Sequence, residues 1–210
     1  MGHQKRTLLT CLTAAAVALL PVIGTAADKS HSPTSVRPAA PRIAIDNFGQ
    51  INANYYRGAQ PEGRDYKDLA TLGVKTVIDL QADGNPGEEQ LVKSAGMKFH
   101  RIPMTTRVVP TEEQLSHFMK LVNDPANQPV YVHCAGGRHR TGVMTAAYRI
   151  NHDRWNAEQA FKEMKDYKFG ADFLHPEFKR FVYAYHVEPQ PTAPAVLATG
   201  VIAAEPVATR

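Results

Sequence analysis

Ten consecutive residues combine a nucleophile with groups that can bind an anion. They read His133-Cys134-Ala135-Gly136-Gly137-Arg138-His139-Arg140-Thr141-Gly142. A thiolate is a strong nucleophile, and an arginine can offer two parallel N–H groups to two oxygens of one phosphate. The two glycines let the backbone between them turn tightly, because no Cβ stands in the way. The pattern predicts a loop that binds a phosphate group and attacks it at phosphorus.

The segments on both sides of this loop predict how it is held. Residues 129–132 (PVYV) form a short, continuous apolar run typical of a buried strand, and an apolar-faced helix is expected over 141–154. A loop between a strand and a helix N-terminus directs its backbone N–H groups inward, and the helix adds about half a positive charge. In that field the pKa of Cys134 should fall below the free value of about 8.5.

The rest of the central chain alternates between strand and helix patterns. The spacing of apolar, turn and capping residues predicts strands over 55–57, 75–80, 98–102 and 129–132, and helices over 64–72, 88–95, 111–122, 141–154, 156–167 and 176–186. Thr111 with Gln114, and Asn156 with Gln159, have the spacing of capping boxes. Alternating strands and helices predict an α/β fold of three layers, with a mostly parallel central sheet flanked by helices.

The full pattern His-Cys-x-x-Gly-x-x-Arg-Thr-Gly resembles the dual-specificity branch of the cysteine-dependent tyrosine phosphatase superfamily. The resemblance covers residues 55–185. The segment 56–61 (YRGAQP) is similar to bacterial and atypical members, while 127–130 and 139–142 resemble the plant and fungal atypical group that acts on inositol pyrophosphates. The resemblance implies a dual-specificity-phosphatase-like fold and a phosphatase that needs no cofactor.

Carried over by position, the resemblance implies a role for each residue of the loop. Cys134 would form a phosphocysteine, and Arg140 would bind the phosphate and stabilise the equatorial charge of the transition state. Thr141 would donate a hydrogen bond to the sulfur and help its release, and His133 would orient the loop from below. The phosphate would be bound by Ala135, Gly136, Gly137, Arg138, His139 and Arg140.

The sequence departs from the family at the proton donor. Members of the superfamily protonate the leaving oxygen with an aspartate on the segment after a strand like 99–103, but Thr106 stands there and residues 103–110 contain no carboxylate. A hydroxyl of high pKa is a poor general acid near neutrality. Asp83 or His139 could serve instead, or the leaving group could be good enough alone, as in a phosphoanhydride. A third reading is a catalytically weak module that binds phosphate ligands.

Charges around the loop bear on the substrate class. Arg138 and His139 add positive charge at the rim, and Arg101 and Arg107 are expected on the facing wall. This favours a polyanion such as an inositol phosphate or pyrophosphate, with a phosphoprotein as the other class. A rhodanese-type sulfur carrier also uses a Cys loop before a helix, but its usual loop lacks the Arg-Thr-Gly ending.

The N-terminus has the order of a secretory signal peptide. Residues 1–6 are basic, 8–20 are mostly Leu, Ala and Val, and 24–27 are small. The apolar run is shorter than the ~20 residues that span a membrane. We expect an exported protein, periplasmic or secreted, without a membrane span once residues 1–27 are removed. The predicted organisation continues with a flexible leader (28–42), the phosphatase domain (43–186) and a disordered Pro/Ala-rich tail (187–210).

Composition narrows the remaining function classes. The chain has 24 Lys and Arg against 20 Asp and Glu; without Lys5 and Arg6 the 22 basic residues nearly balance the acids, so nucleic-acid binding is not indicated. Cys11 lies in the signal segment, which leaves Cys134 as the lone thiol and excludes a structural disulfide. The nine His lack metal-ligand spacing, and no G-x-x-x-x-G-K-[ST] loop occurs, so neither a metal site nor triphosphate chemistry is expected. No oligomeric state is predicted.

Overall fold

The computed structural model of this protein describes residues 42–186. The predicted signal segment, nearly all of the predicted leader and the predicted C-terminal tail lie outside the described residues. Among the helices of residues 42–186, none combines the length and the apolar character that a membrane crossing requires.

Five strands and six α-helices follow one another along residues 42–186. In chain order they are β1 (Gly49–Asn52), β2 (Tyr55–Gly58), α1 (Asp65–Leu72), β3 (Thr76–Gln81), α2 (Glu88–Ser94), β4 (Lys98–Met104), α3 (Glu112–Asn123), β5 (Val130–His133), α4 (Arg140–His152), α5 (Ala157–Asp166), the short 3₁₀ helix η1 (Asp172–Leu174) and α6 (Pro176–Ala184). The strands form one sheet in the order β1-β2-β5-β3-β4. All neighbours pair in parallel except β1 and β2. The predicted α/β class and mostly parallel sheet are confirmed.

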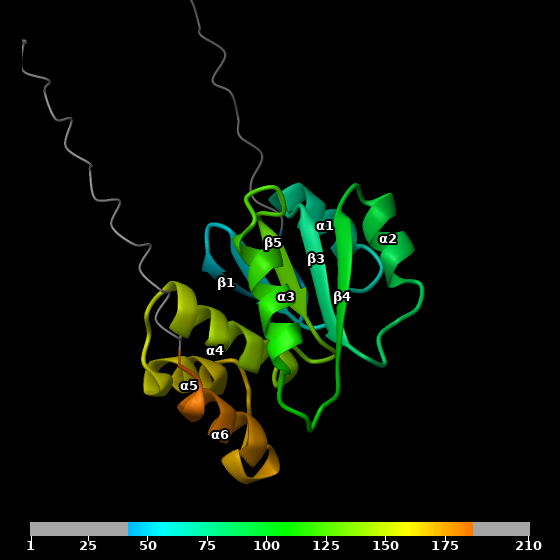
Figure 1. Ribbon diagram of the computed structural model, residues 1–210. Coiled ribbons are helices and arrows are strands. Elements are labelled where there is room, and N and C mark those ends of the chain that lie inside the picture. The colour runs from blue at the N-terminus through cyan, green and yellow to red at the C-terminus, as the bar shows by residue number, and fades with distance from the viewer. Residues whose placement is uncertain (1–41, 187–210) are drawn as a thin grey trace, which may run out of the picture. The chain divides into compact units, whose positions relative to one another are not determined.

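The sheet separates two apolar cores, because successive side chains of a strand point to opposite faces. On β5, Val130 and Val132 join the core that packs under α3 to α6, while Tyr131 joins the core under α1 and α2. The same alternation places Ile78 in the first core and Val77 in the second. Helices therefore cover both faces, as Figure 1 shows with α3 and α4 on one side of the sheet and α1 and α2 on the other.

Helix boundaries follow the capping residues that the sequence offers. Thr111 and Asn156 each accept a hydrogen bond from the backbone of the residue three positions on, whose glutamine side chain reaches back, so both predicted capping boxes are formed. Gly73 ends α1 in the left-handed conformation, and Pro176 is the first residue of α6. These local signals explain why most helices begin and end within two residues of their predicted positions.

The carboxyl end of β5 lies in the middle of one edge of the sheet. β5 lies between β2 and β3 and runs parallel to both, so the carboxyl ends of the three strands meet. In open α/β sheets such an edge is where ligands bind. Residues 134–139 leave this edge and lead directly into α4, which begins at Arg140.

Candidate active site

The ten-residue motif forms the wall of a small cavity. The cavity has a volume of about 210 Å³ and is lined by Thr106, Cys134, Ala135, Gly136, Arg138, His139 and Arg140. All of these except Thr106 belong to the loop between β5 and α4 and to its first helical residue. The predicted phosphate-binding residues are thus brought around one cavity, with the exception of Gly137, whose backbone faces the protein interior.

Cys134 is a buried free thiol in the wall of this cavity. Burial on its own raises the pKa of the thiol, but hydrogen bonds from the Thr141 side chain and backbone, the charge of Arg140 and the backbone N–H of Arg138 together lower it below its ordinary value. The Thr141 hydroxyl is buried and has no other hydrogen-bond partner in residues 42–186. The surroundings therefore favour the thiolate over the thiol.

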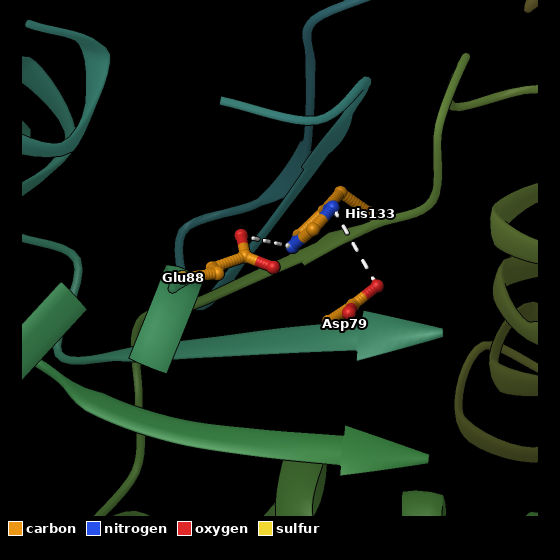
Figure 2. A group of neighbouring side chains, drawn as sticks. All are labelled: Asp79, Glu88 and His133. Atoms are coloured by element: carbon orange, nitrogen blue, oxygen red, sulfur yellow. Dashed lines mark ion pairs between the residues drawn. The ribbon is translucent and has the colours of Figure 1, made fainter. Parts of the chain in front are cut away.

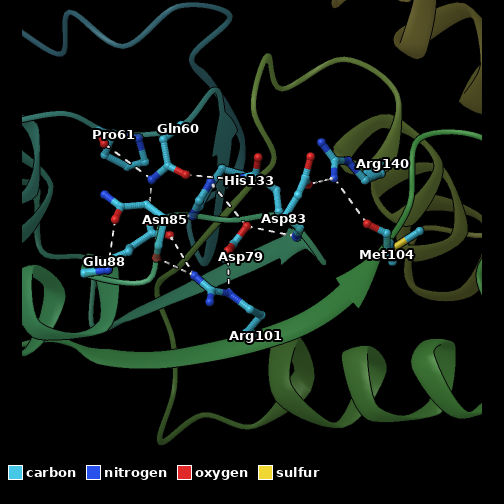
Figure 3. Close-up of polar contacts among 12 residues, drawn as sticks. Gln60, Pro61, Asp79, Asp83, Asn85, Glu88, Arg101, Met104, His133 and Arg140 are labelled. Atoms are coloured by element: carbon cyan, nitrogen blue, oxygen red, sulfur yellow. Dashed lines mark hydrogen bonds and ion pairs between the residues drawn. The ribbon is translucent and has the colours of Figure 1, made fainter.

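Arg140 is almost completely buried between the cavity and the end of the sheet. Its Nη1 donates to Asp83 Oδ1 at 2.9 Å and to the Met104 carbonyl at 3.2 Å, as Figure 3 shows. A neighbouring cavity of about 280 Å³, lined by Ala82, Asp83, Thr105, Thr106 and Arg140, continues from the first past the guanidinium. The side chain is fixed at the junction of the two cavities.

His133 lies beneath the loop, fully buried at the end of β5. Its Nε2 is 3.0 Å from Glu88 Oε1 and its Nδ1 is 4.0 Å from Asp79 Oδ1 (Figure 2). Burial raises the pKa of Glu88, but hydrogen bonding and charge from His133, with hydrogen bonds from Gln60 and Tyr66, outweigh it and lower the pKa below its ordinary value. The placement fits the predicted orienting role, and Glu88 and Asp79 are partners that the sequence reasoning missed.

Asp79, Glu88 and His133 also have the side-chain types of a metal site, and their ligand atoms lie within 4.8 Å of one another. The two carboxylates, however, flank opposite nitrogens of the imidazole (Figure 2). An ion between the ring and one carboxylate would leave the other on the far side of the ring. Arg101 already supplies positive charge, with Nε donating to Asp79 Oδ2 at 2.8 Å and Nη2 at 3.8 Å from Glu88 Oε2. We therefore read this buried trio as a support for His133.

The segment opposite the loop holds no carboxylate. Thr106 lines both cavities, and residues 105–108 are exposed. Asp83 is nearby, but the hydrogen bond and charge of Arg140 lower the pKa of its carboxyl group, so it is ionised at neutral pH. His139 is half-buried; burial and the charge of His175 lower its pKa, and its Nε2 lies 3.0 Å from the Phe169 carbonyl. Both predicted acid candidates lie at the cavities, each already bonded to a protein partner.

The prediction that Arg101 lies on the wall facing the phosphate loop is wrong. This side chain pairs with Asp79 below the loop and lines a different cavity, beside α3. Arg107 lies outside the lining of both active-site cavities and donates to the Leu174 carbonyl at 3.3 Å. Arg138 remains at the rim, 3.7 Å from Asp46 Oδ2. The sequence could not reveal the pairing of Arg101 with Asp79. In the strand pattern Arg101 occupies the position of an exposed residue, and Asp79 lies within a strand that the pattern predicts to be apolar.

Comparison with known proteins identifies relatives of this arrangement. A family model described as "DSP-PTPase phosphatase fused to NAD+ Kinase" matches residues 45–178. The inositol diphosphatase SIW14 of Saccharomyces cerevisiae is 28% identical over 133 residues, which cover 60% of this chain and 47% of SIW14. The dual specificity protein phosphatase TpbA of Pseudomonas aeruginosa is 29% identical over 145 residues, 67% of this chain and 65% of TpbA. The matched part therefore spans about half of SIW14 and just under two thirds of TpbA.

Solved structures of the same two proteins have the same fold. The core catalytic domain of SIW14 in complex with citrate superposes with a TM-score of 0.60 at 25% identity, covering 67% of this chain and 86% of that domain. A cysteine-to-serine variant of TpbA in complex with pTyr superposes with a TM-score of 0.58 at 27% identity, covering 70% and 91%.

Proposed function

The chain belongs to the family of cysteine-dependent dual-specificity phosphatases, and we propose that it hydrolyses phosphomonoesters through a phosphocysteine on Cys134. One observation carries the proposal. Cys134 lies in the wall of an anion-sized cavity, and its pKa is lowered by Thr141, Arg140 and the backbone of the loop. A thiolate held there faces any phosphate that the loop binds.

The reaction would proceed in two displacements. In the first, the Cys134 sulfur attacks phosphorus, an S–P bond forms, and the P–O bond to the leaving group, an ester or an anhydride, breaks to release the alcohol, phenol or phosphate. In the second, water attacks phosphorus, the S–P bond breaks, and inorganic phosphate and the thiolate are released. The Arg140 guanidinium and the loop N–H groups stabilise the charge on the equatorial oxygens, while the Thr141 hydroxyl stabilises the sulfur each time it carries negative charge.

The missing carboxylate restricts the leaving groups that this site can expel. With Asp83 ionised against Arg140, the leaving oxygen must depart with little help from a protein acid. Without that help an aryl oxygen or the phosphate of an anhydride leaves more readily than an alkyl oxygen. We therefore propose substrates with good leaving groups, such as phosphotyrosine or an inositol pyrophosphate, ahead of phosphoserine.

A panel of substrates tests the proposal directly. We expect turnover of p-nitrophenyl phosphate, phosphotyrosine peptide and inositol pyrophosphate, and at least ~10-fold slower turnover of phosphoserine peptide. Cys134→Ser should remove turnover of all of them, and acid quenching of the wild type should trap a phosphate on the peptide that contains Cys134. Turnover that survives Cys134→Ser would contradict the covalent mechanism.

A phosphate-binding module is the second candidate, favoured by the absence of a carboxylate from residues 103–110. It predicts that the wild type binds vanadate but does not turn over p-nitrophenyl phosphate, whose leaving group needs little protonation.

Export is a separate proposal and is supported by the order of basic, apolar and small residues over 1–27. Cell fractionation and N-terminal sequencing of the mature protein test it. A protein that keeps Met1 and stays in the cytoplasm would contradict it.

A further inference from the structure

The phosphate loop has a second side, which faces the protein interior. When a loop directs its N–H groups into a cavity, its carbonyl oxygens turn the other way and need donors there. Residues 47–60 supply these donors with one backbone N–H and two side chains. The Gln60 N–H donates to the Ala135 carbonyl at 3.2 Å, Asn47 Nδ2 donates to the Gly137 carbonyl at 2.8 Å, and Arg57 Nη2 donates to the same carbonyl at 2.5 Å.

Arg57 is the unusual member of this set, because it is a fully buried arginine in β2. Its guanidinium carbon lies 4.0 Å from the centre of the Tyr167 ring. Its Nε and Nη1 are buried without a hydrogen-bond partner. No carboxylate in residues 42–186 lies within ion-pair distance of it, although the charge of Glu163 acts on it from farther away. Burying a charge is costly unless something compensates it, and arginine does not give up its proton in proteins.

The loop supplies part of that compensation, because its Gly137 carbonyl accepts a hydrogen bond from the guanidinium. Gly137 has a positive φ of 63°, and a Cβ there would overlap the backbone of Gly58 and Ala59. The loop thus packs directly on the end of β2, with no space for a side chain between them. Gly58 also pairs in register with His133, the residue before the nucleophile. Burial lowers the pKa of Arg57, whereas the charges of Tyr55, Glu163 and Tyr167 when ionised, and to a smaller extent that of Cys134, raise it.

We propose that Arg57 is a positioning residue of the phosphate loop, which holds the Gly137 carbonyl out of the cavity and balances the negative charge that the loop carries. That charge is the Cys134 thiolate in the free protein and the phosphoryl group during the reaction. Electrostatic interaction is strong across this contact, since Arg57 is fully buried and bulk solvent does not screen its charge. The role of Arg57 during the reaction rests on the proposed function. Its contact with the loop rests on the hydrogen bond to Gly137 and on its burial.

Substitution of Arg57 by Met and by Lys separates this role from simple packing. Methionine fills the space without charge, so a packing role predicts that Arg57→Met is tolerated at least as well as Arg57→Lys, whose ammonium must be buried. A positioning role predicts the opposite order in activity. Arg149→Met is the matched control: Arg149 is also largely buried and its guanidinium carbon lies 4.2 Å from the centre of the Trp155 ring, but it pairs with Asp153 and Glu163 instead of the loop.

Four quantities are measured on the full chain: kcat/KM for p-nitrophenyl phosphate, the Kd of vanadate, Tm, and the pH dependence of iodoacetamide alkylation of Cys134, read by mass spectrometry. We expect Arg57→Met to reduce kcat/KM and vanadate affinity by ~100-fold and to move the alkylation midpoint to higher pH. Arg57→Lys should lose only ~10-fold, with a smaller shift of the midpoint. Arg149→Met should lower Tm alone.

Two results would overturn the inference: vanadate affinity and an alkylation midpoint for Arg57→Met close to those of the wild type, or Arg57→Lys no better than Arg57→Met. If Arg57→Met does not fold, Arg57→Lys decides, because wild-type values for it would show that the forked donor is dispensable. A wild type without turnover would contradict the proposed function, and vanadate binding and alkylation would still test Arg57.

Discussion

The phosphate loop and the segment that faces it across the cavity are supported very differently. Behind the loop, buried donors bind the carbonyls of Ala135 and Gly137, and His133 is held between Glu88 and Asp79. The facing residues 105–108 are exposed. Arg107, one of these residues, donates a hydrogen bond to the Leu174 carbonyl.

This difference indicates for which step of the proposed reaction the site is preorganised. Attack on phosphorus needs a thiolate and an oxyanion site in fixed positions, and both are built from buried residues. Departure of the leaving oxygen needs a proton or a stable anion, and the exposed side supplies no carboxylate from its own segment. The substrate must contribute what that side lacks.

The sharpest test of the supported side is Arg140→Lys. Lysine keeps the charge but cannot offer two parallel donors to the phosphate, so kcat/KM for p-nitrophenyl phosphate should fall by about 10²–10³-fold. Steady-state kinetics beside the exposed control Arg64→Lys measure the effect, with vanadate affinity as a second reading. A loss of less than tenfold would mean that charge alone suffices and that the buried geometry matters little.

The facing side is tested by adding what it lacks. Thr106→Asp places a carboxyl group in the lining of the phosphate cavity and should raise kcat for phosphotyrosine peptide by about 10–100-fold, with little change for p-nitrophenyl phosphate. Thr105→Asp is the control, because Thr105 lines only the neighbouring cavity. An equal gain in kcat on both substrates would point to a step that they share, the hydrolysis of the phosphocysteine, and would remove the contrast between the two sides.

Asp83→Asn should have the smallest effect. The carboxylate shares Arg140 with the phosphate, so its neutralisation should tighten vanadate binding by about 2–5-fold. Since Arg140 lowers the pKa of Asp83, the carboxyl group is ionised from pH 5 to pH 8, and the gain should be the same at both ends of that range. If Asp83 were the general acid, the substitution would instead reduce kcat for phosphotyrosine peptide by about 10²-fold or more and remove the alkaline limb of its pH profile.

Local signals were sufficient to predict the fold class from the sequence. The apolar runs at β3 and β5, the capping boxes at Thr111 and Asn156 and the stop at Gly73 each act within a few residues. β1 was missed because only Ile51 of its four residues is buried, so its pattern is that of a loop. It forms because β2 offers an unpaired edge, which a single-sequence pattern does not reveal.

The residues that face the cavity could be predicted in the same way, because they are adjacent in the chain. The residues that support the loop from behind could not be predicted. Asn47 and Arg57 reach the Gly137 carbonyl from 90 and 80 residues away, and Glu88 reaches His133 from 45 residues away. One signal for Arg57 was available in the sequence. It ends the predicted strand 55–57, and a charged side chain that a strand buries requires a buried partner.

The close packing of Gly137 on Gly58 also bears on protein engineering. We do not expect the ten-residue motif to keep its conformation when it is transferred alone to another protein, although its residues are contiguous. Grafted into a scaffold without the stretch from Asn47 to Gln60, it would meet a different wall, and its peptide planes would be free to flip. The two stretches form one structural unit, so we expect a substitution in one to require a compensating substitution in the other.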